Sequence, residues 1–312
     1  MRELHLHLDG SMRPSTVLEL YQEQNLIPPC NDILTMKKML TANPQAKDLA
    51  EVLQVFSIPL KVLQKEYALT RAAKELVIDL KKAGNDYAEV RFAPQLSTRE
   101  GLTQKQVLQA VIKGVKEGEK EAGMKIGLLL CLMRGGTKEE NKETVLLAHE
   151  FLGEVVKGLD LAGDENNYPC RLYEDEFALA RSFSIPFTIH AGESKSLENV
   201  KDAIRFGARR LGHGCSIIHD RELMHIVKEE GILIECCITS NQQTKEVVDM
   251  SKHPIRDYFD YGMMVNINSD NMTVSDTDIQ KEIALAKKYC HFTDEEQKSM
   301  NTQKKPLFKG EE

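Results

Sequence analysis

The feature that most constrains the fold is a series of short apolar runs that recurs along the whole chain. Each run has the length of a buried strand and leads toward a segment with helical periodicity. Eight runs can be counted, and they begin at Glu3, Tyr87, Lys125, Val155, Ile185, Ala208, Ile232 and Met263. Eight strands alternating with helices in 312 residues are typical of one closed barrel. The sequence therefore predicts an α/β fold, a (β/α)8 TIM barrel, with residues 1–312 as a single domain.

The segments between the runs carry helical signals. Apolar residues recur at helical spacing from Thr103 to Gly123, and Thr103 and Gln106 have the spacing of a capping box. The main alternative for such a pattern is a doubly wound open sheet. Its dinucleotide-binding form would show G-x-G-x-x-G after the first strand, and this chain has no such motif there. The barrel is therefore favoured.

One interval between strands is longer than the others. Extra helical material is expected between the first and second strands, roughly from Leu26 to Gln64, and it is interrupted by Pro28, Pro29, Pro44 and Pro59. Elements inserted after a barrel strand lie over the C-terminal mouth of the barrel, where barrel active sites are found. We therefore expect a lid over a site rather than a separate domain. Residues 301–312 are expected to form a polar tail.

Composition and charge exclude several classes of function. The net charge of −7 argues against a nucleic-acid-binding surface, which needs clustered Lys and Arg. No apolar run approaches the ~20 residues of a membrane span. The seven cysteines form no C-x-x-C pair, as expected of free thiols in a reducing compartment. N-terminal cleavage would remove the histidines that begin at His5, so we expect no leader and a cytoplasmic protein.

The N-terminal run places polar side chains at alternate positions. In "LHLHLD", His5, His7 and Asp9 alternate with leucines and so share one face of a strand. Alone, this pattern also fits an exposed edge strand. Further polar residues follow the ends of later runs, however, and these ends meet at the catalytic mouth of a barrel. They are the acids of "DLAGDE", His190 and Glu193 in "HAGE", His213 in "GHG", and Asp270 and Asn271 in "SDN".

Three imidazoles and one carboxylate among these residues indicate a metal site. The predicted ligands are His5, His7, His190 and Asp270. This set suits Zn²⁺ with an open position for water, although Fe²⁺ or Co²⁺ could use the same ligands. A metal of this kind brings the pKa of bound water close to neutrality.

Two further residues are predicted to serve catalysis. Glu193 follows the ligand His190 by three positions and is expected to shuttle protons. His213 lies between glycines that allow close backbone approach, and it is expected to orient the attacking water. The alternatives are an acid at a helix N-terminus and a core histidine bonded to backbone, respectively. Of the other histidines, His253 is expected to be structural, and the remainder are expected at the surface: His149, His219, His225 and His291.

Taken together and in order, "HLHLDGSMRP", "DLAGDE", "TIHAGE", "RLGHG", "TSN" and "NINSDN" resemble the adenosine deaminase family of metal-dependent amidohydrolases. "EVRFAPQL" and "HPIRDYFDYG" also look like segments of that family, and the resemblance runs from residue 1 to about 295. It implies one zinc ion per chain on the four predicted ligands. It also implies that Glu193 protonates purine N1 and that His213, helped by Asp270, positions the hydroxide.

The resemblance implies a purine nucleoside as partner, with His7, Asp9, Gly163 and Asn271 as substrate contacts. Gly163 would contact purine N3, and Asp9 would contact a ribose hydroxyl. The implied reaction is hydrolytic deamination of adenosine to inosine and ammonia, a step of purine salvage. The chain departs from the family in carrying Asn271 where a second acid is common, and Ile238 where Pro often precedes "TSN". The H-x-E and P-C-x-x-C motifs of cytidine-type deaminases are absent.

Other readings of the same site remain open from sequence. Another aminopurine is the nearest alternative, but adenine-specific relatives tend to carry Glu at the position of Asp9. AMP would call for Lys or Arg, or a glycine-rich loop, near the mouth, and Arg13 is the only obvious cation there. Methylthioadenosine and other 5′-modified nucleosides also remain open as substrates. A binding protein without catalysis is disfavoured, because neither a ligand nor Glu193 has been lost.

Overall fold

In the computed structural model, which describes residues 1–153 and 155–300, the predicted apolar runs form eight parallel strands. The strands are β1 (Arg2–His7), β2 (Tyr87–Phe92), β3 (Lys125–Met133), β4 (Val156–Ala162), β5 (Thr188–Ala191), β6 (Arg210–His213), β7 (Leu233–Cys236) and β8 (Met264–Ile267). Each lies within or directly beside its predicted run, so the strand prediction is confirmed. The predicted tail, residues 301–312, lies outside the described residues.

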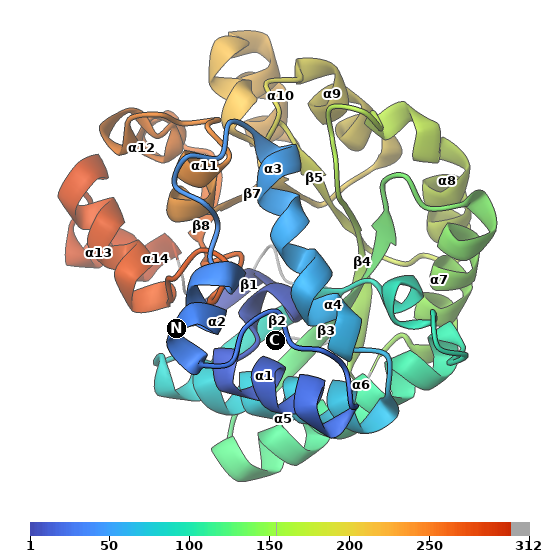
Figure 1. Ribbon diagram of the computed structural model, residues 1–312. Helices are drawn as coiled ribbons and strands as arrows, with labels where there is room; N and C mark the ends of the chain where they lie inside the picture. The colour runs from blue at the N-terminus through green and yellow to red at the C-terminus, as the bar shows by residue number, and fades with distance from the viewer. Residues whose placement is uncertain (154, 301–312) are drawn as a thin grey trace.

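The strands close into a barrel through two seams. Hydrogen bonding joins β1–β4 in one four-stranded sheet and β5–β8 in another, and every neighbouring pair is parallel. Single parallel bridges connect the sheets, one between Leu159 and Phe187 and one between Leu6 and Asp270. At the second seam His7 N donates to Asp270 O at 2.7 Å. The predicted (β/α)8 topology is therefore confirmed (Figure 1).

Helices surround the barrel, as Figure 1 shows. They are α1 (Pro14–Glu23), α5 (Glu66–Lys82), α6 (Gln104–Ala122), α7 (Lys138–Phe151), α8 (Glu174–Ser182), α9 (Leu197–Phe206), α10 (Arg221–Glu229), α11 (Ile238–Gln243), α12 (Ile255–Tyr261), α13 (Ile279–Cys290) and α14 (Asp294–Met300). The capping box at α6 is present, with Thr103 and Gln106 bonded reciprocally, and Gly123 ends the helix in the left-handed conformation. Within the described residues, no helix is both long and apolar enough to cross a bilayer.

The predicted insertion between β1 and β2 lies across the mouth of the barrel. It contains α2 (Ile33–Leu40), α3 (Leu49–Leu53) and α4 (Ser57–Val62), and α3 and α4 cross in front of the strands in Figure 1. A small apolar cluster joins it to the loop after β8 through Ala42, Val52 and Val274. The lid is thus tied to a loop that carries predicted site residues.

The two faces of β1 serve different purposes. Leu4, Leu6 and Leu8 are at most 2% exposed and face away from the histidines, as the alternation predicts. Leu6 and Leu8 join an apolar cluster that extends along the chain as far as Met300. The inner face instead meets charged side chains inside the barrel.

Those charges form a buried network that the sequence did not reveal. Arg91 donates Nη1 to Asp160 Oδ2 and Nη2 to Glu235 Oε2, both at 2.9 Å. Arg210 Nε lies 2.9 Å from Glu235 Oε1, and its guanidinium also bonds Glu89. All of these side chains are fully buried. Although burial opposes ionisation, Arg91 and Arg210 hold the pKa of Glu235 well below its ordinary value.

Removing the shared cation should destabilise the barrel strongly. Arg91→Met leaves Asp160 and Glu235 buried with fewer partners, so we expect the free energy of unfolding to fall by ~3–5 kcal/mol. The control is Arg71→Met, because Arg71 pairs with Glu19, Glu23 and Glu75 on a partly exposed helix surface. That change should cost at most ~1 kcal/mol. Urea denaturation of both variants measures the difference, and equal losses would contradict the prediction.

Candidate active site

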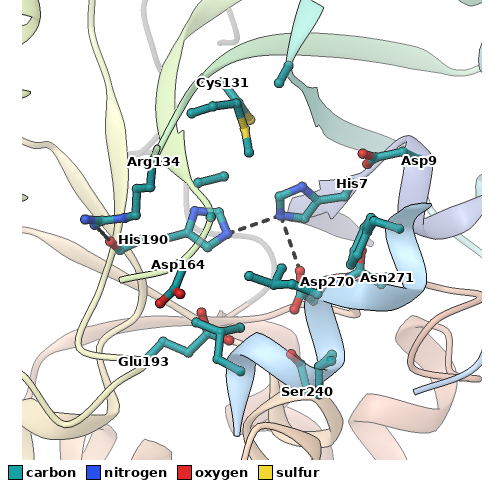
Figure 2. Close-up of a pocket in the computed structure, with 18 of the residues that line it drawn as sticks. His7, Asp9, Cys131, Arg134, Asp164, His190, Glu193, Ser240, Asp270 and Asn271 are labelled. Carbon is teal, nitrogen blue, oxygen red and sulfur yellow. Dashed lines mark hydrogen bonds and ion pairs between the residues drawn. The ribbon is translucent and has the colours of Figure 1, made fainter. Parts of the chain in front are cut away.

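A cavity opens where the C-terminal ends of the strands meet the lid (Figure 2). Its volume is about 320 Å³, and apolar lid side chains form one of its walls. The lid residues are Leu49, Val52, Leu53, Phe56 and Leu60; the predicted site residues in the lining are His7, Asp9, Gly163, His190, Glu193, His213, Asp270 and Asn271. The structure thus brings all the predicted site residues except His5 to the lining of this cavity.

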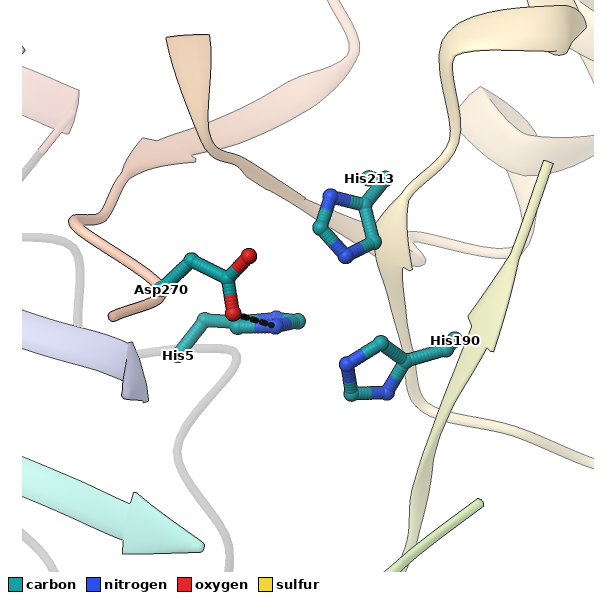
Figure 3. Close-up of side chains that lie close together, drawn as sticks. All are labelled: His5, His190, His213 and Asp270. Carbon is teal, nitrogen blue, oxygen red and sulfur yellow. Dashed lines mark ion pairs between the residues drawn. The ribbon is translucent and has the colours of Figure 1, made fainter. Parts of the chain in front are cut away.

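His5 lies in the barrel interior, in a cluster of imidazoles and a carboxylate. Ligand atoms of His5, His190, His213 and Asp270 all lie within 4.8 Å of one another (Figure 3). His7 belongs to the same cluster, because its Nε2 is 3.1 Å from His190 Nε2 and 3.4 Å from Asp270 Oδ1. These residues come from β1, β5, β6 and the loop after β8.

The spacing of the donor atoms fits a single metal ion. Tetrahedral ligand atoms ~2.0–2.2 Å from one ion lie roughly 3.3–3.5 Å apart. His7 Nε2 and His5 Nε2 each lie 3.4 Å from Asp270 Oδ1, within that spacing, and His7 Nε2 lies slightly closer to His190 Nε2, at 3.1 Å. Burial lowers the pKa of His7 and of His190, which favours the neutral imidazole that metals require. Although burial opposes it, contacts with His5 and other histidines lower the pKa of Asp270 well below its usual range.

Carboxylates hold the outer nitrogens of two of these histidines. His5 Nδ1 lies 2.8 Å from Glu235 Oε2, and His190 Nδ1 lies 2.9 Å from Asp160 Oδ2. Because a carboxylate accepts, each Nδ1 carries the proton and each Nε2 keeps its lone pair toward the cluster. Arg91 bonds both carboxylates, so one buried guanidinium orients two candidate ligands.

The backbone at two site residues is unusual. His213 has φ 66° and Asp270 has φ 59°. Both angles lie in the left-handed region, which residues other than glycine seldom adopt. Such conformations cost energy and are concentrated at functional sites. Gly212 meets a different constraint, because a Cβ there would lie only 2.8 Å from His5 Cε1. A glycine before His213 therefore lets the His5 ring pack against β6.

Glu193 lies on a loop that one carboxylate holds in place. Glu165 accepts backbone N–H bonds from Gly192 at 2.8 Å, Glu193 at 2.9 Å and Ser194 at 3.0 Å. The Glu193 Oε2 atom lies 3.6 Å from His213 Nε2. Burial, reinforced by the charge of Asp270, raises the pKa of Glu193 well above its ordinary value. A carboxyl group that keeps its proton near neutral pH can donate it to a bound base.

Asp9 and Asn271 face the cavity from neighbouring turns. Asp9 begins a 3-10 turn, Asp9–Ser11, directly after β1, and burial raises its pKa to about 6. Asn271 is tightly packed, because a Cβ on Gly10 would lie 1.7 Å from Asn271 Oδ1. The amide oxygen therefore faces Gly10, and the amide nitrogen faces away from it. Only glycine leaves room for this orientation.

The remaining histidine predictions agree with the structure. All four histidines expected at the surface are exposed: His149, His219, His225 and His291. His253 is buried, as a structural residue would be, and its Nε2 lies 3.1 Å from Asn241 Oδ1. The cysteines are all free, as expected.

Sequence analysis missed the residues that support the site. Asp160, Glu235 and Arg91 each interrupt an apolar strand with a charge, and a charge at such a position requires a buried partner. That interruption was the available signal. Glu165 ends the motif "DLAGDE" and Asn241 ends the motif "TSN". No feature of the neighbouring sequence distinguished their roles from those of the adjacent residues.

Comparison with known proteins agrees with the motifs. The family model described as adenosine deaminase matches residues 1–305. The chain is 39% identical over 298 residues to an adenosine deaminase of Enterococcus faecalis, covering 96% of this chain and 88% of the relative. It is 35% identical over 291 residues to an adenosine deaminase of Clostridium kluyveri, covering 93% and 84%.

Solved structures show the same fold. An adenine deaminase from Arthrobacter aurescens superposes with a TM-score of 0.88 at 22% identity, covering 96% of this chain and 90% of that one. An N6-mAMP deaminase from Arabidopsis gives a TM-score of 0.85 at 27% identity, with the same two coverages of 96% and 90%. Since family model and relatives both match along nearly the whole chain, this chain belongs to the adenosine deaminase family of hydrolytic deaminases.

Proposed function

We propose that this chain catalyses hydrolytic deamination of adenosine to inosine and ammonia, with one zinc ion held by His5, His7, His190 and Asp270. The observation that carries the proposal is the close approach of these donor atoms beside a small cavity, which the buried Glu193 also lines. When bound, zinc would supply an activated water for attack at purine C6. His7 is preferred to His213 as a ligand because His7 Nε2 lies close to two other ligand atoms.

The side chains around the cavity divide the remaining work. Glu193 donates its proton to purine N1, which makes C6 more electrophilic. His213 faces Glu193 and orients the attacking water. Asn271 donates an amide N–H to purine N7, and Gly163 contacts N3. Asp9 accepts a hydrogen bond from a ribose hydroxyl, so it favours a nucleoside over the free base.

The charges at the mouth favour a nucleoside over a nucleotide. Among the described residues that line the cavity, Arg134 is the only Lys or Arg, and its guanidinium donates to Tyr168 O and His190 O. Arg13 is held in a two-point contact by Asp79, with both distances 2.6 Å. Neither cation is placed to bind a phosphate. The Arabidopsis neighbour is named for a nucleotide substrate, N6-mAMP. We propose a nucleoside substrate for this chain instead.

One observation supports a second candidate substrate. The lid wall of the cavity is apolar, with Leu49, Leu53 and Phe56 among its residues. An apolar group at the 5′ position of the nucleoside could pack there, as in methylthioadenosine.

The free cysteines fit a reducing compartment, so we place the reaction in cytoplasmic purine salvage.

The proposed reaction and metal are tested together with a substrate panel. Purified protein should contain about one zinc per chain, and it should deaminate adenosine faster than adenine or AMP. Absorbance changes follow the reaction, and elemental analysis gives the metal content. Chelation should abolish activity and added zinc should restore it. Full activity after exhaustive metal removal would refute the mechanism, and faster turnover of methylthioadenosine would identify the second candidate as the substrate.

Glu193→Gln tests the proton donor. The amide keeps the size of the side chain but cannot transfer a proton, so kcat should fall by ~10²–10⁴-fold while metal content stays the same. Glu198→Gln makes the same change at an exposed position on α9 and should leave kcat unaltered. Near-normal kcat in Glu193→Gln would assign the acid role to another group.

Asn271 is tested with a substrate that lacks N7. A buried hydrogen bond left unmade costs ~1–3 kcal/mol, so 7-deazaadenosine should show a kcat/KM roughly 5–150-fold below that of adenosine. Asn271→Ala removes the donor and should lose most of this discrimination. If the variant distinguishes the two nucleosides as sharply as the wild type does, Asn271 only stabilises the loop after β8.

A further inference from the structure

A chain of hydrogen bonds lies behind His213, on the side away from the cavity. Asn241 Nδ2 is 3.0 Å from His213 Nδ1, and His253 Nε2 is 3.1 Å from Asn241 Oδ1. The chain ends on backbone, where Ile255 N donates to His253 Nδ1 at 3.2 Å. The three side chains are between 0% and 2% exposed, so water does not compete for these bonds.

The direction of every bond in this chain follows from its backbone end. The N–H of Ile255 can only donate, so His253 Nδ1 accepts and the proton of that neutral imidazole lies on Nε2. Burial lowers the pKa of His253 to about 3, in agreement with a neutral ring. His253 Nε2–H then donates to the amide oxygen of Asn241. The amide nitrogen of Asn241 consequently faces His213 Nδ1 and donates to it.

We propose that Asn241 and His253 are positioning residues that fix His213 in the tautomer with its proton on Nε2. Because His213 Nδ1 accepts a hydrogen bond, Nε2–H points into the cavity, where Glu193 Oε2 lies at 3.6 Å. His213 therefore donates a hydrogen bond to the attacking oxygen and does not remove its proton in this tautomer. This inference rests on the proposed function for the role of His213, but the tautomer itself does not depend on it.

Asn241 and His253 belong to two sequence motifs to which the proposed reaction assigns no role. Asn241 is the last residue of "TSN" in α11, and His253 begins "HPIRDYFDYG" just before α12. A purely structural reading would have both residues only hold the segment between β7 and α12 in place. Asn241 does make such bonds, since its N–H donates to Cys237 O and its carbonyl accepts from Thr244. The two readings differ in what they predict for the proton on His213.

The first test reads the tautomer directly. In zinc-loaded protein with ¹⁵N-labelled histidine, NMR shows which ring nitrogen of His213 carries a proton, and His213→Gln identifies its signals. We expect the proton on Nε2 in the wild type. In Asn241→Asp, a carboxylate that only accepts replaces the amide donor, so the proton should be found on Nδ1.

The second test is kinetic and uses the same variant. Losing a donor aimed at the reacting oxygen should lower kcat of Asn241→Asp by ~10²–10³-fold, with KM and zinc content little changed. The matched control is Asn141→Asp. The buried Asn141 amide bonds the Met133 backbone and Gln95, and it takes no part in the hydrogen bonds behind His213. That control should lose stability and keep its kcat.

A pair of changes at His253 separates positioning from packing. His253→Gln keeps an amide N–H near the position of Nε2 and should retain most of kcat. His253→Leu keeps the apolar bulk without a donor, and kcat should fall by roughly 5–150-fold because the Asn241 amide loses its fixed orientation. Thermal denaturation of both variants shows whether any loss follows stability instead.

The outcomes distinguish this inference from the proposed function. If zinc-loaded wild type fails to convert adenosine, the proposed function is wrong, whereas the NMR result still reports the tautomer. A proton on Nδ1 of His213 in the wild type would overturn the inference. Wild-type kcat in Asn241→Asp, or equal kcat in the Gln and Leu variants of His253, would overturn it as well.

Discussion

The bond between Arg91 and two buried carboxylates supports both the barrel and its site. Arg91 extends from β2, while Asp160 and Glu235 come from β4 and β7, so one guanidinium links strands of both sheets. The same carboxylates fix the rings of His190 and His5. Burying these charges costs free energy that only full pairing offsets. The donor geometry of the metal cluster therefore depends on a charge balance in the layer beneath it.

Closure of the barrel and assembly of the cluster use the same residues. The seam between β1 and β8 is formed where His7 N donates to Asp270 O and Asp270 N donates to His5 O. The residues whose side chains form the candidate metal site thus also join the first strand to the last. A misregistered seam would turn every second side chain of β1 outward and dismantle the site. The barrel and the candidate site consequently both require the correct register of β1 at this seam.

The sequence predicted those features that depend on local residue patterns or on the symmetry of a barrel. The strands, the capping box at Thr103 and the lid follow from periodicity and spacing. The site residues at strand ends follow because parallel strands in a barrel bring their ends together. The partners of Arg91 could not be predicted, because they depend on which inward side chains meet across the ring. The bond from His253 to Asn241 depends likewise on how a loop folds back, although a structural role for His253 was expected.

The left-handed backbone at His213 and Asp270 has a consequence for the evolution of this scaffold. Each conformation would be relaxed by glycine, which adopts positive φ without steric cost. Replacement by glycine would remove the side chain on which the proposed chemistry depends. The fold thus stores strain at residues of the proposed site, and variants selected only for heat resistance would tend to lose the proposed catalysis first. Thermal robustness and turnover are opposing demands at these two positions.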